Sequence, residues 1–77
     1  MQKLIRVRVK VPTDKFDGLI GYISDYSITT GVSSFKNLPP ERIVRVQLYD
    51  PELLTEVEGA YQKQQLELYQ ELNCGCE

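Results

Sequence analysis

Two stretches of the chain, residues 4–11 and 42–49, alternate between apolar and polar positions. Alternation with a period of two is typical of a β-strand that buries one face, so we predict a strand in each stretch. Pro12 follows the first stretch and cannot donate to a strand ladder. The apolar faces comprise Ile5, Val7, Val9 and Val11 in the first strand, and Val44, Val46 and Leu48 in the second.

Residues 50–73 have the features of one long helix. Asp50 suits the N-cap, Pro51 suits the first helical position, and Asn73 suits the end. A helix of about 22 residues would be about 33 Å long, which is more than a small sheet can cover. The apolar residues that recur at helical spacing are Leu54, Val57, Tyr61, Leu68 and Leu72.

Residues 14–30 fit two interpretations. Gly18, Gly21 and many β-branched residues favour strands around an Asp17-Gly18 turn, whereas the spacing of apolar residues also permits a helix over 14–28. The next segment predicts a short strand over residues 32–36, followed by a stiff Pro39-Pro40 connector.

The segment FDGLIGYI, residues 16–23, resembles the turn and strand at the centre of KOW-type, SH3-like small barrels, through Gly18, Gly21 and Ile23. That family is common among translation and transcription factors and small subunits of larger complexes. The resemblance implies an SH3-like barrel as one option for the fold and no particular activity.

We therefore expect one α+β domain over residues 1–73, with a flexible cysteine-containing tail over 74–77. Its expected architecture is a small, mostly antiparallel sheet or SH3-like barrel followed by one long C-terminal helix. The alternative is a two-layer βαβα sandwich in which residues 14–28 are helical.

The charges are divided unevenly along the chain. The net charge is −2, yet residues 1–47 carry eight Lys and Arg against four Asp and Glu, whereas residues 48–77 carry one Lys against seven Asp and Glu. Such a division can steer a partner electrostatically. The chain has no histidine, so it lacks the usual general base and the commonest metal ligand, and we expect neither an enzyme nor a cofactor.

Two surfaces are candidates for binding. A basic strand face, formed by Arg6, Arg8, Lys10 and Arg45, could bind nucleic acid or remain solvated. The end of the predicted helix extends past the sheet and could bind another protein or a second copy of the chain. The candidate residues on this helix are Tyr61, Gln65, Leu68, Tyr69 and Leu72.

Cys74 and Cys76 could clamp a soft metal, but two thiolates do not complete a zinc site, so they are a weak candidate. No stretch approaches the length of a membrane span, and no signal peptide is apparent, so we expect a cytoplasmic location. The sequence thus favours a small non-enzymatic protein-protein interaction module, either a regulator, an inhibitor or an accessory subunit. The alternative is a nucleic-acid-binding protein.

Overall fold

The computed structural model describes residues 3–73, which form one five-stranded antiparallel sheet with strand order β4-β3-β2-β1-β5. A short helix, α1 (Tyr26–Thr29), and a 3₁₀ turn, η1 (Phe35–Asn37), lie in the long connection between β2 and β3, and a second 3₁₀ turn, η2 (Lys63–Gln65), joins β4 to β5. The strands are β1 (Lys3–Val9), β2 (Ile20–Ile23), β3 (Ile43–Asp50), β4 (Thr55–Gln62) and β5 (Leu66–Asn73).

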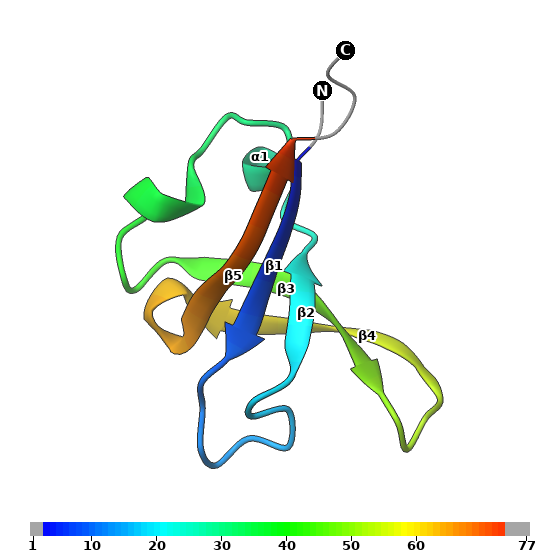
Figure 1. The fold of residues 1–77 in the computed structure, drawn as a ribbon. Helices are drawn as coiled ribbons and strands as arrows, with labels where there is room; N and C mark the ends of the chain where they lie inside the picture. Colours follow the sequence, from blue (N-terminus) through cyan, green and yellow to red (C-terminus); the bar gives the residue numbers. More distant parts are fainter. Residues whose placement is uncertain (1–2, 74–77) are drawn as a thin grey trace.

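Strand β1 is paired on both sides. Val7 lies opposite Gly21 of β2 and opposite Leu68 of β5, so the first strand of the chain joins its last strand to the rest of the sheet. In Figure 1, β1 and β5 run together at a steep angle to β3 and β4, which shows that the sheet is strongly bent. The N- and C-terminal strands therefore lie side by side although they are far apart in the sequence.

The core lies inside this bend, because both halves of the sheet direct their apolar side chains toward it. α1 and η1 contribute Ile28 and Phe35 from the long connection. The buried strand residues are Ile5, Val7, Val9, Ile23, Val44, Val46, Leu48 and Leu66. A cluster this small gives only modest stability, so the loss of one strand would expose much of it.

The two strands predicted from alternation are confirmed. Residues 3–9 and 43–50 form β1 and β3, and the apolar positions of each are buried while most of the intervening ones are exposed. Val11 is the exception on the first strand, since it lies past the end of β1 and is only half-buried.

The expected fold, a sheet or SH3-like barrel followed by a long C-terminal helix, is wrong. Residues 50–73 form β4, η2 and β5 instead. The start of the segment explains part of the difference, because Asp50 caps a turn and not a helix. Its buried carboxylate accepts hydrogen bonds from the backbone N–H groups of Glu52 and Leu53, and Leu54 then adopts a φ of 56° that turns the chain back.

The same segment also satisfies a period of two, which the helical interpretation overlooked. Tyr61 on β4, and Leu66 and Leu68 on β5, pack in or against the core, and Val57 on β4 is half-buried at an alternate position to Tyr61. Pairing decides between the two periods, because β4 completes the ladder of β3 and β5 completes that of β1. Tertiary context therefore overrides the local helical signal.

The interpretation of residues 14–30 as strands is right for β2 only. The alternative sandwich with residues 14–28 helical is wrong, since this range contains turns, β2 and the start of the four-residue α1. The strand predicted over 32–36 is also wrong, because η1 begins at Phe35 and buries that ring in the core. Gly18 has a φ of 85°, which suits the turn inferred at Asp17-Gly18.

Gly21 is required where β2 crosses β3. A Cβ atom there would collide with the backbone oxygen of Gln47 and lie 2.6 Å from Leu48 Cδ2. Gly59 on β4 is less constrained, because the closest obstacle to its Cβ is the movable ring of Tyr61 at 2.9 Å.

We predict that Gly21→Ala lowers the free energy of unfolding by roughly 1–3 kcal/mol, because the Gln47 backbone cannot move away from the added methyl group. Gly59→Ala is the matched control and should change the free energy by less than about 1 kcal/mol, since alanine also stiffens the unfolded chain. Urea unfolding followed by tyrosine fluorescence measures both. Equal losses in the two variants would show that β2 does not approach β3 as described.

Candidate functional site

Strand β1 exposes cationic side chains on the face opposite the core. Ile5, Val7 and Val9 are buried, so the intervening Arg6 and Arg8 point outward, and Lys10 continues the exposed series past the end of the strand. The neighbouring strands place apolar residues on the same side, since Tyr22 lies opposite Arg6 and Ile20 opposite Arg8. We call this surface the β1 face; it comprises Arg6, Arg8, Lys10, Ile20, Tyr22, Tyr69 and Leu72.

A β-bulge brings Tyr69 onto the β1 face. Arg6 is paired with Gln70 and Val7 with Leu68, so Tyr69 is the extra residue of β5 between them. Bulges of this kind redirect a side chain relative to the regular ladder. The ring of Tyr69 is 55% exposed, and its centroid lies 5.9 Å from the guanidinium carbon of Arg8, within the range of a cation–π contact.

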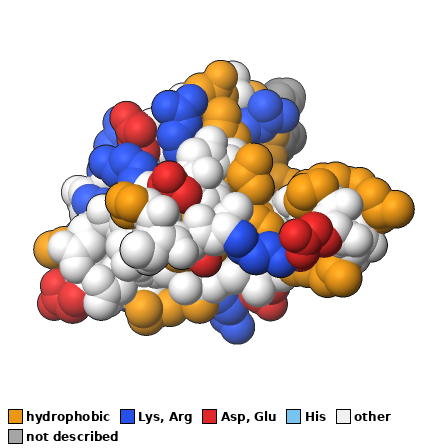
Figure 2. All heavy atoms as spheres, turned by 90° about the horizontal axis from the view of Figure 1, so that it is seen from below, with side chains coloured by type: hydrophobic (Ala, Val, Ile, Leu, Met, Phe, Trp, Pro, Cys, Tyr) orange, Lys and Arg blue, Asp and Glu red, His pale blue; other side chains and the backbone are white. Residues whose placement is uncertain are grey.

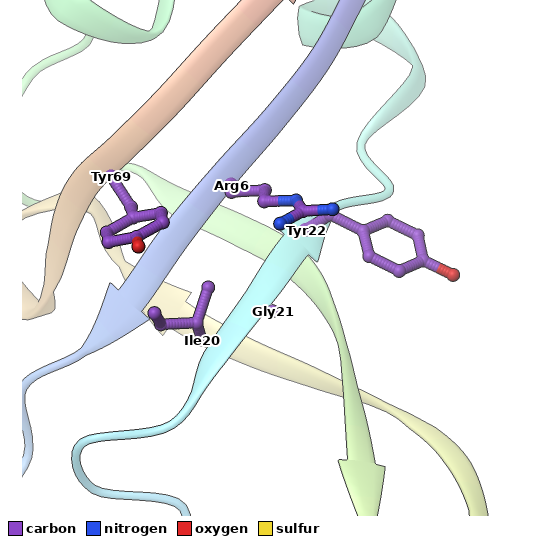
Figure 3. Close-up of a pocket in the computed structure, with 5 residues that line it drawn as sticks. All are labelled: Arg6, Ile20, Gly21, Tyr22 and Tyr69. Carbon is purple, nitrogen blue, oxygen red and sulfur yellow. The ribbon is translucent and has the colours of Figure 1, made fainter.

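A hollow of about 330 Å³ lies in the middle of the β1 face. Figure 3 shows Tyr69 and Ile20 on one side of it and the Arg6 side chain extending from β1 toward Tyr22. Gly21, whose Cβ position faces β3 and the core, contributes only backbone to the lining of the hollow. The hollow therefore combines an aromatic wall, an aliphatic wall and a guanidinium group at its rim.

Tyr22 is held in place from the adjacent hairpin. Its hydroxyl donates a hydrogen bond of 2.9 Å to Glu56 on β4, and this bond, with some burial, raises the pKa of Tyr22 above 10.0. The Tyr22 phenol therefore remains neutral. The Glu56 carboxylate, in turn, is already engaged as the acceptor of this hydrogen bond.

The cations of the β1 face have no carboxylate within ion-pair distance among the described residues. Other cations of residues 3–73 do form such pairs, at distances of 3.0 to 3.7 Å. These pairs are Lys3–Glu71, Lys15–Asp50, Lys15–Glu52, Arg42–Asp25 and Arg45–Glu58. Positive charge available to a ligand is thus present along β1.

The structure brings three of the four predicted basic residues together. Arg6, Arg8 and Lys10 are all exposed along β1. Arg45 lies apart from them, because β2 separates β3 from β1, and its Nε is 3.7 Å from a carboxylate oxygen of Glu58.

The five residues predicted on the long helix are dispersed, because that helix does not exist. Tyr61 packs against the core and donates a hydrogen bond to Asp14; burial and this bond raise its pKa above 10.0. Gln65 accepts a hydrogen bond of 2.9 Å from the backbone N–H of Gln62, and Leu68 packs against the core. Tyr69 and Leu72 are the two that reach the β1 face, from strand β5.

Ile20 and Tyr22 are functional candidates that the sequence interpretation missed. Both lie on β2 at alternate positions, and their relative exposures are 40% and 37%. The period of two in IGYI was the available signal, since burying Gly21 and Ile23 requires the other two side chains to point outward.

A second hollow, of about 240 Å³, lies between the 15–19 turn and the β3–β4 connection. Lys15 Nζ contacts the buried Asp50 carboxylate at 3.0 Å there, and this hydrogen bond lowers the pKa of Asp50 below 3.8. In Figure 2, hydrophobic side chains gather on a lobe at the right, and cationic and acidic side chains lie beside it. The exposed residues Leu53 and Leu54 belong to this connection. Because Lys15, the cation that lines it, already pairs with Asp50 and Glu52, the second hollow is the weaker candidate.

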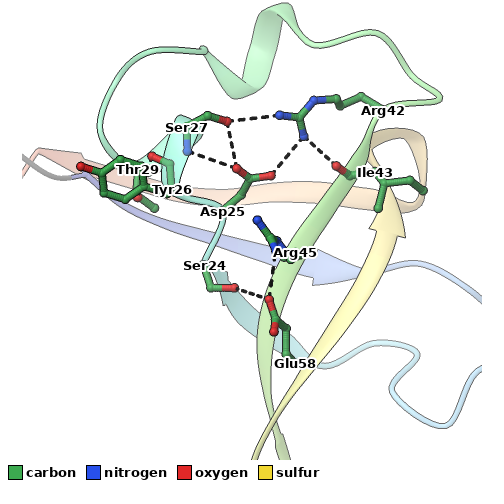
Figure 4. A network of polar contacts seen from close by, with 9 residues as sticks. All are labelled: Ser24, Asp25, Tyr26, Ser27, Thr29, Arg42, Ile43, Arg45 and Glu58. Atoms are coloured by element: carbon green, nitrogen blue, oxygen red, sulfur yellow. Dashed lines mark hydrogen bonds and ion pairs between the residues drawn. The ribbon is translucent and has the colours of Figure 1, made fainter.

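The polar network around Asp25 is structural (Figure 4). Asp25 is buried; it accepts hydrogen bonds from the backbone and hydroxyl of Ser27 and, at 3.1 Å, from Arg42 Nη1. Burial alone would raise the pKa of Asp25, but these hydrogen bonds outweigh it and lower the pKa below 3.8. The network joins α1 to the start of β3 and so fastens the long connection to the sheet.

Residues 3–73 contain no group of three or more His, Cys, Asp or Glu side chains placed to hold a metal ion. Cys74 and Cys76, the weak metal candidates, lie outside the described residues. Within the described part of the chain, no helix is long and apolar enough to cross a membrane. No protein family, curated protein or solved structure matches this chain.

We predict that Asp25→Asn lowers the free energy of unfolding at neutral pH by on the order of 1–2 kcal/mol, because the charge-assisted bond from Arg42 is lost while an N-cap acceptor remains. The pKa of Asp25 is lower in the folded than in the unfolded chain, so its contribution is present above about pH 4 and is lost as the pH falls through the folded pKa.

Urea unfolding of the wild-type protein and the Asp25→Asn variant over a pH series measures the difference between their free energies of unfolding. It should be constant near neutral pH and shrink under acid conditions, with the other carboxylates cancelling between the two proteins. A difference that does not change on acidification would show that the Asp25 carboxylate is not held by Arg42.

Proposed function

We propose that this chain is a small non-enzymatic module that binds another protein through the β1 face and works in the cytoplasm. The observation that supports the proposal best is the hollow bounded by Arg6, Ile20 and Tyr69, in which exposed apolar side chains adjoin cations with no ion-pair partner among the described residues.

The composition of the β1 face supports a protein partner. Tyrosine and arginine are the residues that most often dominate the binding energy of protein interfaces, and here Tyr69 and Arg6 share the rim of one hollow. Leu72, at 45% exposure, adds aliphatic surface on the same strand as Tyr69. A volume of about 330 Å³ suits one or two anchoring side chains of a partner.

Other functions have less support. The groups most used for proton transfer or nucleophilic attack are histidine, cysteine, serine, lysine and carboxylates, whereas the hollow is lined by Arg6, Ile20, Gly21, Tyr22 and Tyr69. A nucleic-acid binder is typically basic, but this chain has a pI of about 5.1, and Glu56 and Glu67 adjoin the β1 face.

The test compares variants in affinity capture from native cell lysate treated with nuclease. Tyr69→Ser and Ile20→Ser should reduce retention of the partner by about tenfold or more, because each removes an apolar anchor from the hollow. Tyr26→Ser and Val32→Ser are matched controls, since these residues are 71% and 79% exposed outside the β1 face, and retention should not change.

Unchanged thermal unfolding of all four variants is required before retention is compared. Equal loss of retention in the control variants would contradict a specific β1 face. Loss of all retention after nuclease treatment would favour nucleic acid over protein.

A further inference from the structure

The β1 face holds a row of cations. Arg6, Arg8 and Lys10 occupy alternate positions on one side of the chain, so neighbouring charges are about 7 Å apart along the strand. Glu67 is paired with Arg8 in the ladder, but their charged groups are not within ion-pair distance. Three cations against two adjoining carboxylates, Glu56 and Glu67, leave a local excess of positive charge, although the whole chain has a net charge of −2.

Apolar side chains flank this row on both sides. Ile20 and Tyr22 lie on β2, and Tyr69 and Leu72 lie on β5. Figure 3 shows the Arg6 side chain between the two flanks. A ligand that covered the whole face would therefore place negative charge along β1 and apolar groups at either side of it.

On this basis, and resting on the proposed function, we infer that the β1 face binds an acidic segment of another protein whose carboxylates are accompanied by aromatic or aliphatic side chains. The carboxylates lie against Arg6 and Arg8, where bidentate, charge-assisted hydrogen bonds are available. An apolar side chain of the segment enters the hollow and packs against Tyr69 and Ile20. The cations give specificity and fast association, and the apolar contacts give most of the affinity.

The chain has an acidic, apolar segment of its own, the β3–β4 connection with Leu53 and Leu54, but a second copy is the less suitable occupant. Glu52 of this connection lies 3.6 Å from Lys15, and Glu56, just beyond it on β4, accepts the hydrogen bond of Tyr22, so both carboxylates already have partners. A second copy would have to break these contacts before its carboxylates could bind the β1 face, whereas a separate protein with free carboxylates would not.

Selection of random short peptides displayed on phage tests the inference without knowledge of the partner. We expect the wild-type protein to enrich peptides that combine two or more Asp or Glu with aromatic or aliphatic residues. Synthetic versions should bind about tenfold more weakly to the Arg6→Gln, Arg8→Gln double variant, and binding should weaken as NaCl is raised. Lys36→Gln, which removes an exposed cation outside the β1 face, should leave affinity unchanged.

Enriched peptides without acidic residues, or equal affinity for the double variant, would overturn the inference. So would displacement of the peptides by single-stranded oligothymidylate, which would indicate a phosphate ligand, or concentration-dependent self-association by light scattering that the same substitutions abolish. If Tyr69→Ser loses the lysate partner but the double variant keeps it at every salt concentration, the proposed function stands and the acidic ligand does not.

Discussion

The structure depends on the pairing of β1 with β2 on one side and with β5 on the other. This double pairing holds β1 in place, so that Ile5, Val7 and Val9 are buried in one cluster with the apolar residues of β3. Contacts this distant in sequence are costly to form, because a long loop must close before they are gained. A chain of 77 residues has little other apolar surface to bury, so this pairing is the constraint on which the core depends.

The same pairing creates the candidate binding face. Alternation along β1 places the cations opposite the core, β2 adds Ile20 and Tyr22 in register, and β5 adds Tyr69 through its bulge. The core and the face are therefore two sides of the same three strands. Because Arg6 and Arg8 contact solvent and not the core, they can be altered with little effect on stability, whereas their buried neighbours cannot.

The parts of the fold that the sequence predicts correctly are those with one unambiguous period. β1 and β3 alternate strictly at their apolar positions and are confirmed. Residues 50–73 fit periods of two and of 3.6, and the ladders of β3 and β1, which are not visible locally, select the first. The Asp50 side chain accepts hydrogen bonds from backbone N–H groups, and such an aspartate can cap either a helix or a turn. Asp50 alone therefore does not show that a helix begins there.

The site was predictable to a similar extent. The cationic row follows directly from the alternation of residues 4–11, and it lies where that pattern places it. The apolar flanks do not follow, because they require the register of β2 and the bulge that separates Leu68 from Gln70. Tyr69 and Leu72 are candidates on the predicted helix, but they reach the β1 face for another reason, since they lie on an edge strand beside β1.

Nuclear Overhauser effects between backbone protons of residues 3–9 and 66–73 test the double pairing of β1 most directly. The double pairing predicts cross-strand contacts between Val7 and Leu68 and between Leu4 and Leu72, with strong sequential α-to-amide contacts through residues 55–62. Strong amide-to-amide contacts running continuously through residues 55–73, with no cross-strand contact to residues 3–9, would mean that the segment is helical. The core and the β1 face described above would then both be wrong.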